Sequence, residues 1–190
     1  FRNVTGVQTC ALPICGPMNI RTTTDANGTY SFNDLTAGTY TVSEQVQNNW
    51  GVSLPVTRTF SITITSGLNA TGKNFGNYIY STLSGISFED MNGNGTYDIG
   101  EQGLSGKKIK VNGTKSDSAI TDGTGNYSID SLKPGSYPVQ QNSTAGWTQT
   151  LPTSPSSYSI SVVSNSTISN KNFGNFKLAK SRLITEEDFI

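Results

Sequence analysis

Alternating apolar and polar residues recur in short stretches along this chain of 190 residues. Phe60-Ser-Ile-Thr-Ile64 and Tyr158-Ser-Ile-Ser-Val-Val163 are two clear cases, and Lys107-Lys-Ile-Lys-Val111 has the same period. A period of two residues is typical of a β strand that buries one face. No segment before residue 177 combines helical periodicity with helix caps. The pattern therefore predicts an all-β chain.

Turn sequences divide the second half of the chain into short predicted strands. The turns are Asn112-Gly113 and residues 122–126 and 133–135, which are rich in Gly, Asn, Asp and Pro. Strands are expected at residues 84–88, 107–111, 127–129, 136–140, 158–163 and 169–173, with Ile109 and Val111 as core candidates. Short strands separated by such turns predict a β-sandwich.

The chain also contains a long internal repeat. Residues 30–42 (YSFNDLTAGTYTV) match residues 127–139 (YSIDSLKPGSYPV) at an offset of 127 − 30 = 97. Residues 74–77 and 172–175 are both NFGN, and their offset of 172 − 74 = 98 requires one inserted residue. A period near 97 residues is that of whole domains in tandem.

These matches set the expected domain boundaries. Residues 16–77 are expected to form a repeat truncated at its N-terminus, which lacks the region equivalent to residues 85–110. Residues 78–84 are the expected linker, and residues 85–176 the complete repeat. Two interpretations of the tail, residues 177–190, stay open. Ile184-Thr-Glu-Glu-Asp188 aligns with Ile86-Ser-Phe-Glu-Asp90 as the start of a third repeat, or the tail is an unrelated segment that forms a short helix.

The N-terminal segment differs from the rest. Residues 4–14 (VTGVQTCALPI) resemble the conceptual translation of a sequencing-library adapter. On this interpretation residues 1–15 are an artefact, and the natural chain begins near Cys15 or Gly16 without a pair of cysteines. The alternative is a genuine N-terminal segment.

Composition narrows the classes of function. The chain has 13 basic and 13 acidic residues, so nothing indicates a nucleic acid or an anionic membrane as partner. The absence of histidine excludes histidine-based acid–base and zinc chemistry, and no paired catalytic acids stand out, so we expect no enzyme activity. No apolar run reaches the roughly 18 residues of a membrane span.

One loop carries candidate chemistry. Residues 90–101 (DMNGNGTYDIGE) have oxygen-bearing side chains at positions 1, 3, 5, 9 and 12 and glycine at position 6, which is the ligand spacing of an EF-hand loop. The predicted calcium ligands are the side chains of Asp90, Asn92, Asn94, Asp98 and Glu101 and the backbone carbonyl of Thr96.

The flanks of this loop are predicted strands rather than helices, and positions 3 and 5 are neutral. Fewer charges predict a weak site suited to extracellular calcium. Magnesium fits less well, because it prefers six ligands in strict octahedral geometry. An exposed polar turn without a metal is the alternative.

Residues 85–104 (GISFEDMNGNGTYDIGEQGL) resemble the opening of the B repeats of serine–aspartate-repeat (Sdr) surface adhesins. Residues 122–127, 132–137, 146–147 and 172–175 are similar to later landmarks of that repeat, whose wider relatives are the collagen-adhesin Cna B-type domains. The resemblance implies tandem immunoglobulin-like Greek-key sandwiches in a secreted or cell-surface protein, attached to the cell wall or a surface layer. It also implies non-catalytic stalk repeats stiffened by calcium. Their partners would be neighbouring repeats of the same chain, with a host protein or glycan bound through other domains.

Some Cna B-type domains form a Lys–Asn isopeptide bond assisted by a buried acid. The candidate acid in the first copy is Glu44, and its equivalent in the second copy is Gln141, whose amide cannot relay protons as a carboxyl can. The bond is therefore not expected in the second copy, and the first copy lacks the strand that would carry the lysine. Lys107 and Lys108 are expected to be surface lysines.

A second class of function is a carbohydrate-binding module appended to a surface enzyme. Trp50 and Trp147 recur at one place per repeat, where they would form a stacking platform for a sugar. The alternative is a tryptophan packed at the edge of each sandwich.

Overall fold

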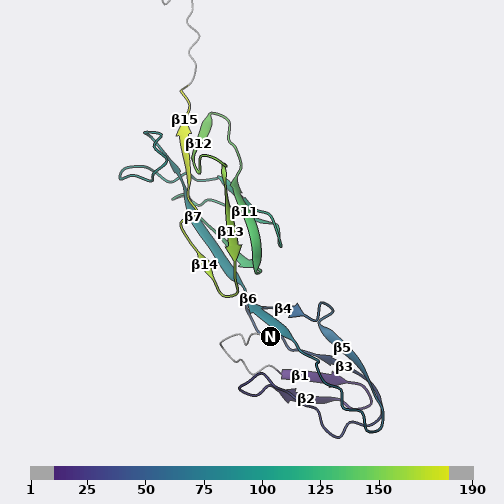
Figure 1. Cartoon of the computed structure of the whole chain (residues 1–190). Coiled ribbons are helices and arrows are strands. Elements are labelled where there is room, and N and C mark those ends of the chain that lie inside the picture. The colour runs from purple at the N-terminus through teal and green to yellow at the C-terminus, as the bar shows by residue number, and fades with distance from the viewer. Residues whose placement is uncertain (1–10, 180–190) are drawn as a thin grey trace, which may run out of the picture. The chain divides into compact units, whose positions relative to one another are not determined.

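The computed structural model describes residues 11–179, and every regular element in that part is a β strand. The chain divides into two compact units between Tyr80 and Ser81, and we describe each unit by itself (Figure 1). The prediction of an all-β chain is confirmed. No helix among these residues has the length and apolar character that a membrane span requires.

The second unit is a sandwich of two sheets. Its strands are β7 (Ser81–Glu89), β8 (Lys108–Val111), β9 (Asp117–Ile120), β10 (Asn126–Leu132), β11 (Gly135–Gln141), β12 (Trp147–Leu151), β13 (Ser157–Val162), β14 (Thr167–Ile168) and β15 (Phe173–Lys177). One sheet has the order β10-β7-β15-β12, with β14 beside β7, and the other has the order β13-β11-β8-β9. The chain passes repeatedly from one sheet to the other, and the predicted immunoglobulin-like sandwich is confirmed.

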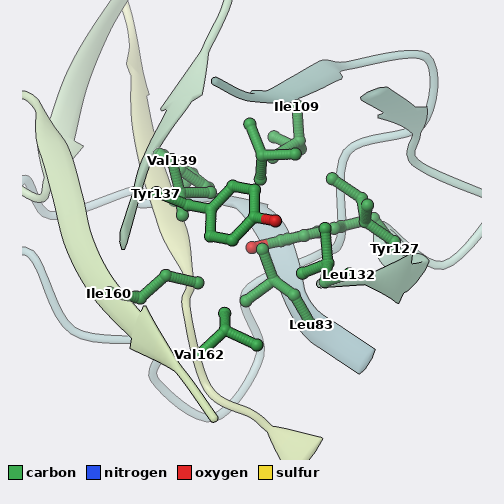
Figure 2. Packing of buried hydrophobic residues seen from close by; sticks show 11 residues of the cluster. Leu83, Ile109, Tyr127, Leu132, Tyr137, Val139, Ile160 and Val162 are labelled. Carbon is green, nitrogen blue, oxygen red and sulfur yellow. The ribbon is translucent and has the colours of Figure 1, made fainter. Parts of the chain in front are cut away.

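The core of this unit lies between the two sheets. Figure 2 shows side chains from both sheets pointing toward one another around Tyr137. Ile109 and Val111 are completely buried, as the alternation in residues 107–111 predicts. The buried cluster consists of Leu83, Ile109, Val111, Tyr127, Ile129, Leu132, Tyr137, Val139, Ile160, Val162 and Phe173.

Strand β7 holds one sheet of the sandwich together. It pairs antiparallel with β10 and parallel with β15, so both of its edges are hydrogen-bonded. Its side chains Leu83 and Phe88 are completely buried. Because its last residue is Glu89, β7 leads directly into the candidate calcium loop.

The strand predicted at residues 169–173 is wrong in position. The final strand, β15, begins only at Phe173. Asn170 has a φ of 59°, in the left-handed region, which interrupts an extended strand. Apolar alternation alone did not show this break.

The first unit has the same plan with fewer strands. One sheet has the order β2-β1-β3-β5, made of β1 (Ala11–Cys15), β2 (Ile20–Thr23), β3 (Gly38–Ser43) and β5 (Thr59–Ile64). Strands β4 (Trp50–Leu54) and β6 (Gly76–Ile79) form a separate pair. Tyr40 pairs with Ile62 here as Tyr137 pairs with Ile160 in the second unit, so the repeat extends to strand register.

Strand β1 occupies the position of β8. Ile14 pairs with Val42 just as Val111 pairs with Val139, and Leu12 and Ile14 are buried. The expectation that the first copy starts near residue 16 therefore fails for the fold, because residues 11–15 supply two apolar side chains at the spacing of Ile109 and Val111. The adapter interpretation of residues 4–14 stays a prediction, and residues 4–10 lie outside the described part.

Two strands of the second unit have no counterpart among residues 11–79. These are β7 and β10. Residues 29–35, which are equivalent to β10, form no strand. The reason is physical: β10 builds its ladder on β7, and the first unit has no such strand to pair with. Of the expected linker at 78–84, only Tyr80 lies outside a strand, and most of the tail lies outside the described residues.

Candidate metal centre

The candidate loop is closed at its base by backbone hydrogen bonds. The amide of Asp90 donates to the carbonyl of Asn175 in β15 at 2.9 Å, and the amide of Glu89 donates to Gln102 at 2.8 Å. Phe88 also forms an isolated bridge with Gly103. The loop is thus fixed to two neighbouring strands of the sandwich.

Asp90 is the centre of the loop's hydrogen bonding. Its carboxylate is completely buried and accepts the amides of Gly93 and Gly95, each at 2.7 Å, and that of Asn94 at 3.1 Å. Burial by itself raises the pKa of a carboxyl group, but the hydrogen bonds outweigh it, and the pKa of Asp90 lies below its ordinary value. Asp90 is therefore held ionised. Gly95 has a φ of 76°, which supports the sharp turn expected at this position.

Glu101 joins the two ends of the loop. One carboxylate oxygen accepts the amide of Met91 at 2.9 Å, and the other accepts the amide of Asp98 at 3.0 Å. The side chain is only 8% exposed. Position 12 is therefore brought beside position 1, as an ion-binding loop requires.

The remaining predicted side chains meet at Asp98. Its Oδ2 accepts the side-chain amides of Asn92 at 2.9 Å and Asn94 at 2.8 Å. The oxygen of Asn94 accepts the amide of Thr96 at 2.7 Å. Asn92, Asn94 and Asp98 thus converge on the exposed side of the loop.

These donors suit a hard cation in kind, since all are oxygens. Each carboxylate oxygen has two lone-pair directions, so the amide bonds to Asp90 and Glu101 leave further acceptor capacity. Within residues 11–179, however, no three acidic, cysteine or histidine side chains approach closely enough to form a metal cluster. The calcium assignment stays a prediction, supported by donor type and loop closure.

The comparison with protein families decides where the chain belongs. A family model described as "SdrD B-like domain" matches residues 75–186, which include the candidate loop. The chain belongs to this family. The resemblance to B repeats of Sdr adhesins is confirmed, and the second unit is its SdrD B-like domain.

Curated relatives of this SdrD B-like chain include serine-aspartate repeat-containing proteins. Protein F of Staphylococcus epidermidis is 31% identical over 150 residues, which are 68% of this chain and 8% of that protein. Protein C of Staphylococcus aureus strain Newman is 33% identical over 144 residues, which are 68% of this chain and 15% of that protein. The chain therefore spans a small part of the length of these relatives.

Solved structures give more distant matches to the SdrD B-like chain. The Bacillus anthracis TIE protein has a TM-score of 0.41 at 16% identity, covering 89% of this chain and 31% of that one. GBS52, the minor pilin of Streptococcus agalactiae, has a TM-score of 0.41 at 12% identity, covering 95% and 87%.

A buried polar network in the SdrD B-like domain was not anticipated. Ser87 donates to the Oε1 of Gln141 at 2.7 Å, and Asn175 donates to the Oγ of Ser87 at 3.0 Å. Ser87 and Asn175 are almost fully buried. The only sequence signal was the equivalence of Gln141 and Glu44, since the three residues come from three different strands.

The first unit holds half of the same network. Asn77 donates to Glu44 Oε1 at 2.6 Å, as expected if Asn77 is equivalent to Asn175. Glu44 Oε2 and Asn77 Oδ1 are buried and have no hydrogen-bond partner. The residue at the position of Ser87 is missing with the strand that would carry it.

Lys107 is not the surface lysine that was expected. It is 6% exposed, and its Nζ lies 4.5 Å from the centroid of the Trp147 ring. Burial lowers the pKa of its ammonium group. Lys177 Nζ lies 5.7 Å from the same ring, so Trp147 is engaged with two lysines of its own domain. Lys108 is exposed, as expected.

Proposed function

We propose that this chain is a pair of non-catalytic structural repeats from the stalk of a cell-surface adhesin, with calcium bound at residues 90–101 stiffening the second repeat. The observation that carries the proposal is the loop's attachment. Its first residue, Asp90, is fully buried and hydrogen-bonded to β15, while its last, Glu101, reaches back to the amide of Met91. Membership of the SdrD B-like family supports the role as a repeat.

A bound cation would stiffen this part of the sandwich by neutralising the loop's acids. Asp90, Asp98 and Glu101 place three carboxylates within twelve residues, and their repulsion opposes closure of the loop. Asp90, Asn92, Asn94, Asp98 and Glu101 would hold calcium through their side chains, and Thr96 through its carbonyl. An ion that binds only the folded state stabilises it by about 2.7 kcal/mol at a hundredfold excess over Kd.

The proposed site is suited to the outside of a cell. Two of its ligand positions are neutral asparagines, and low ligand charge corresponds to affinities of about 10⁻⁴–10⁻³ M, as in extracellular modules. The repeats would then contact neighbouring repeats of the same chain and hold other domains away from the cell wall or surface layer. Those other domains would bind the host protein or glycan.

Calorimetric titration of calcium into the full chain tests the site. We expect one saturable binding event, weakened at least tenfold in Asp98→Asn, because the change removes a charged ligand from the convergent group. Asp117→Asn is the matched control, since Asp117 lies in β9 with Lys115 as its partner at 2.6 Å. No binding by the unmodified chain, or equal binding by the Asp98→Asn and Asp117→Asn variants, would refute the site.

A further inference from the structure

The first unit has an open groove where the second unit has a filled core. The groove encloses about 1240 Å³, and it is lined by apolar and polar side chains of this unit alone, among them Leu12, Tyr30, Phe32, Ile62, Phe75 and Asn77. A protein interior is normally packed without voids much larger than a water molecule. A cavity of this size marks the place of a missing element.

Residues equivalent in the two repeats show which element is missing. Ile160 is 6% exposed and Val162 is 2% exposed in the second unit. Their equivalents Ile62 and Ile64, 98 positions earlier, are only partly buried. The same difference separates Leu132, which is completely buried, from its partly buried equivalent Leu35. In the second unit, β7 lies over this part of the core.

Two equivalent glycines give independent support. A Cβ on Gly125 would lie 2.4 Å from the carbonyl oxygen of Ser87 in β7. A Cβ on Gly28, its equivalent 97 positions earlier, would meet nothing within 4 Å, although the two glycines have similar φ angles of 81° and 77°. The turn is the same in both units, and only the strand against it is absent in the first.

The polar groups facing the groove define what the missing strand must offer. Glu44 Oε2 and Asn77 Oδ1 are buried acceptors without partners. Both residues line the groove. In the second unit, the hydroxyl of Ser87 in β7 donates to Gln141, the equivalent of Glu44. A buried acceptor without a donor costs free energy, so a strand that brings a hydroxyl to this point relieves that cost.

The strand pairing of the first unit is also incomplete. Strand β15 pairs with both β12 and β7, whereas its equivalent β6 pairs only with β4 among the described residues. Residues 29–35 likewise have no strand partner. Both positions can pair with an added strand, which is a common way to bind an extended peptide.

We propose that the first unit binds an extended strand of another polypeptide that has the side-chain pattern of β7. The strand would run parallel to β6 and antiparallel to residues 29–35. It would place an apolar side chain at the position of Leu83 and a hydroxyl at the position of Ser87, against Glu44 and Asn77.

The chain's own segments fit less well. Strand β7 is already paired on both edges within its own unit. Residues 179–187 stand in the sequence where Ser81–Glu89 stands in the preceding repeat, but they carry Ser181 and Glu186 at the positions of Leu83 and Phe88. Replacing two buried apolar side chains by polar ones removes most of the burial that would drive binding.

A labelled peptide with the sequence of residues 81–90 (STLSGISFED) tests the proposal by fluorescence anisotropy with the full chain in EDTA. Working in EDTA separates the result from calcium binding. We expect saturable one-to-one binding. The peptide with Leu83→Asp should bind at least tenfold more weakly, and that with Ser87→Ala about fivefold more weakly through loss of one hydrogen bond.

Two variants of the chain test the groove itself. Ile62→Asp places a charge on its apolar wall and should abolish binding, whereas Ile120→Asp, at a surface position that is 67% exposed, should not. Gly28→Ala leaves the free chain folded, since its Cβ meets nothing, but obstructs the incoming strand and should weaken binding at least tenfold. The proposal fails if the peptide does not bind, if Leu83→Asp or a scrambled peptide binds equally, or if Gly28→Ala has no effect. It also fails if a peptide of residues 179–190 binds more tightly, because the occupant is then the chain's own tail.

Discussion

Tyr127 and its equivalent Tyr30 show how one side chain ties the same two segments together in both repeats. Tyr127 donates its hydroxyl to the carbonyl of Lys171 at 2.6 Å, and Tyr30 donates to Lys73. Tyr127 is 4% exposed, and burial raises its pKa far above the ordinary value. A buried neutral phenol therefore links stability to alkaline pH.

We expect Tyr127→Phe to lower the free energy of unfolding of the second unit by about 1–3 kcal/mol near neutral pH, because the carbonyl of Lys171 loses its donor. The pH dependence should change as well. A folded-state pKa above the unfolded value gives stability that is present below about pH 10 and lost as the pH rises further. Phenylalanine removes this part of the alkaline loss.

Urea unfolding at about pH 7 and about pH 10.5 measures both effects. Tyr97→Phe is the control, since Tyr97 is 45% exposed and should leave stability nearly unchanged. An alkaline loss in Tyr127→Phe as steep as in the unmodified chain would contradict the role assigned to the buried phenol.

Sequence spacing predicted the residues of the loop because ligands within twelve residues keep a fixed order along the chain. It did not predict the network of Ser87, Gln141 and Asn175. Hydrogen bonds there join residues separated by 54, 34 and 88 positions, and only the folded strands bring them together. Lys107 was missed for the same reason, because its partner Trp147 comes from another strand.

At the scale of elements, β7 accounts for most differences between the two units. It covers the core of the second unit and gives β10 its partner, and the turn at Gly125 is packed directly against it. Apolar alternation predicted the strands around Ile109 and Ile160. It could not predict that residues 29–35 would fail to form a strand, because strand formation there depends on a partner that lies elsewhere in the chain.

The two equivalent glycines give a matched test of this contact. Gly125→Ala should destabilise the second unit by at least about 3 kcal/mol, because the left-handed φ costs about 1 kcal/mol and the new Cβ also displaces β7. Gly28→Ala should cost the first unit only about 1 kcal/mol, from the backbone conformation alone. Chemical denaturation of the two variants measures the difference, and equal costs would show that β7 does not press on this turn.

At the scale of the whole molecule, the repeat of about 97 residues predicted two domains of one kind, and the structure has two compact units. The sequence did not predict that residues 11–15 would form β1, since their resemblance to an adapter set them aside. Leu12 and Ile14 nevertheless match the alternation of a core strand, and burial of apolar area favours that pairing whatever the origin of the segment.

We expect the two units to unfold in separate thermal transitions. The first unit should unfold at the lower temperature, because its groove leaves core side chains such as Ile62 partly exposed. Its transition should not respond to calcium, since the candidate loop belongs to the second unit.

Differential scanning calorimetry of the full chain in millimolar calcium and in EDTA tests the central claim most directly. Calcium at a hundredfold excess over Kd should raise the upper transition by about 10 °C, leave the lower one in place, and have little effect on the Asp98→Asn variant. If both transitions occur at the same temperatures in calcium and in EDTA, calcium does not stiffen this repeat.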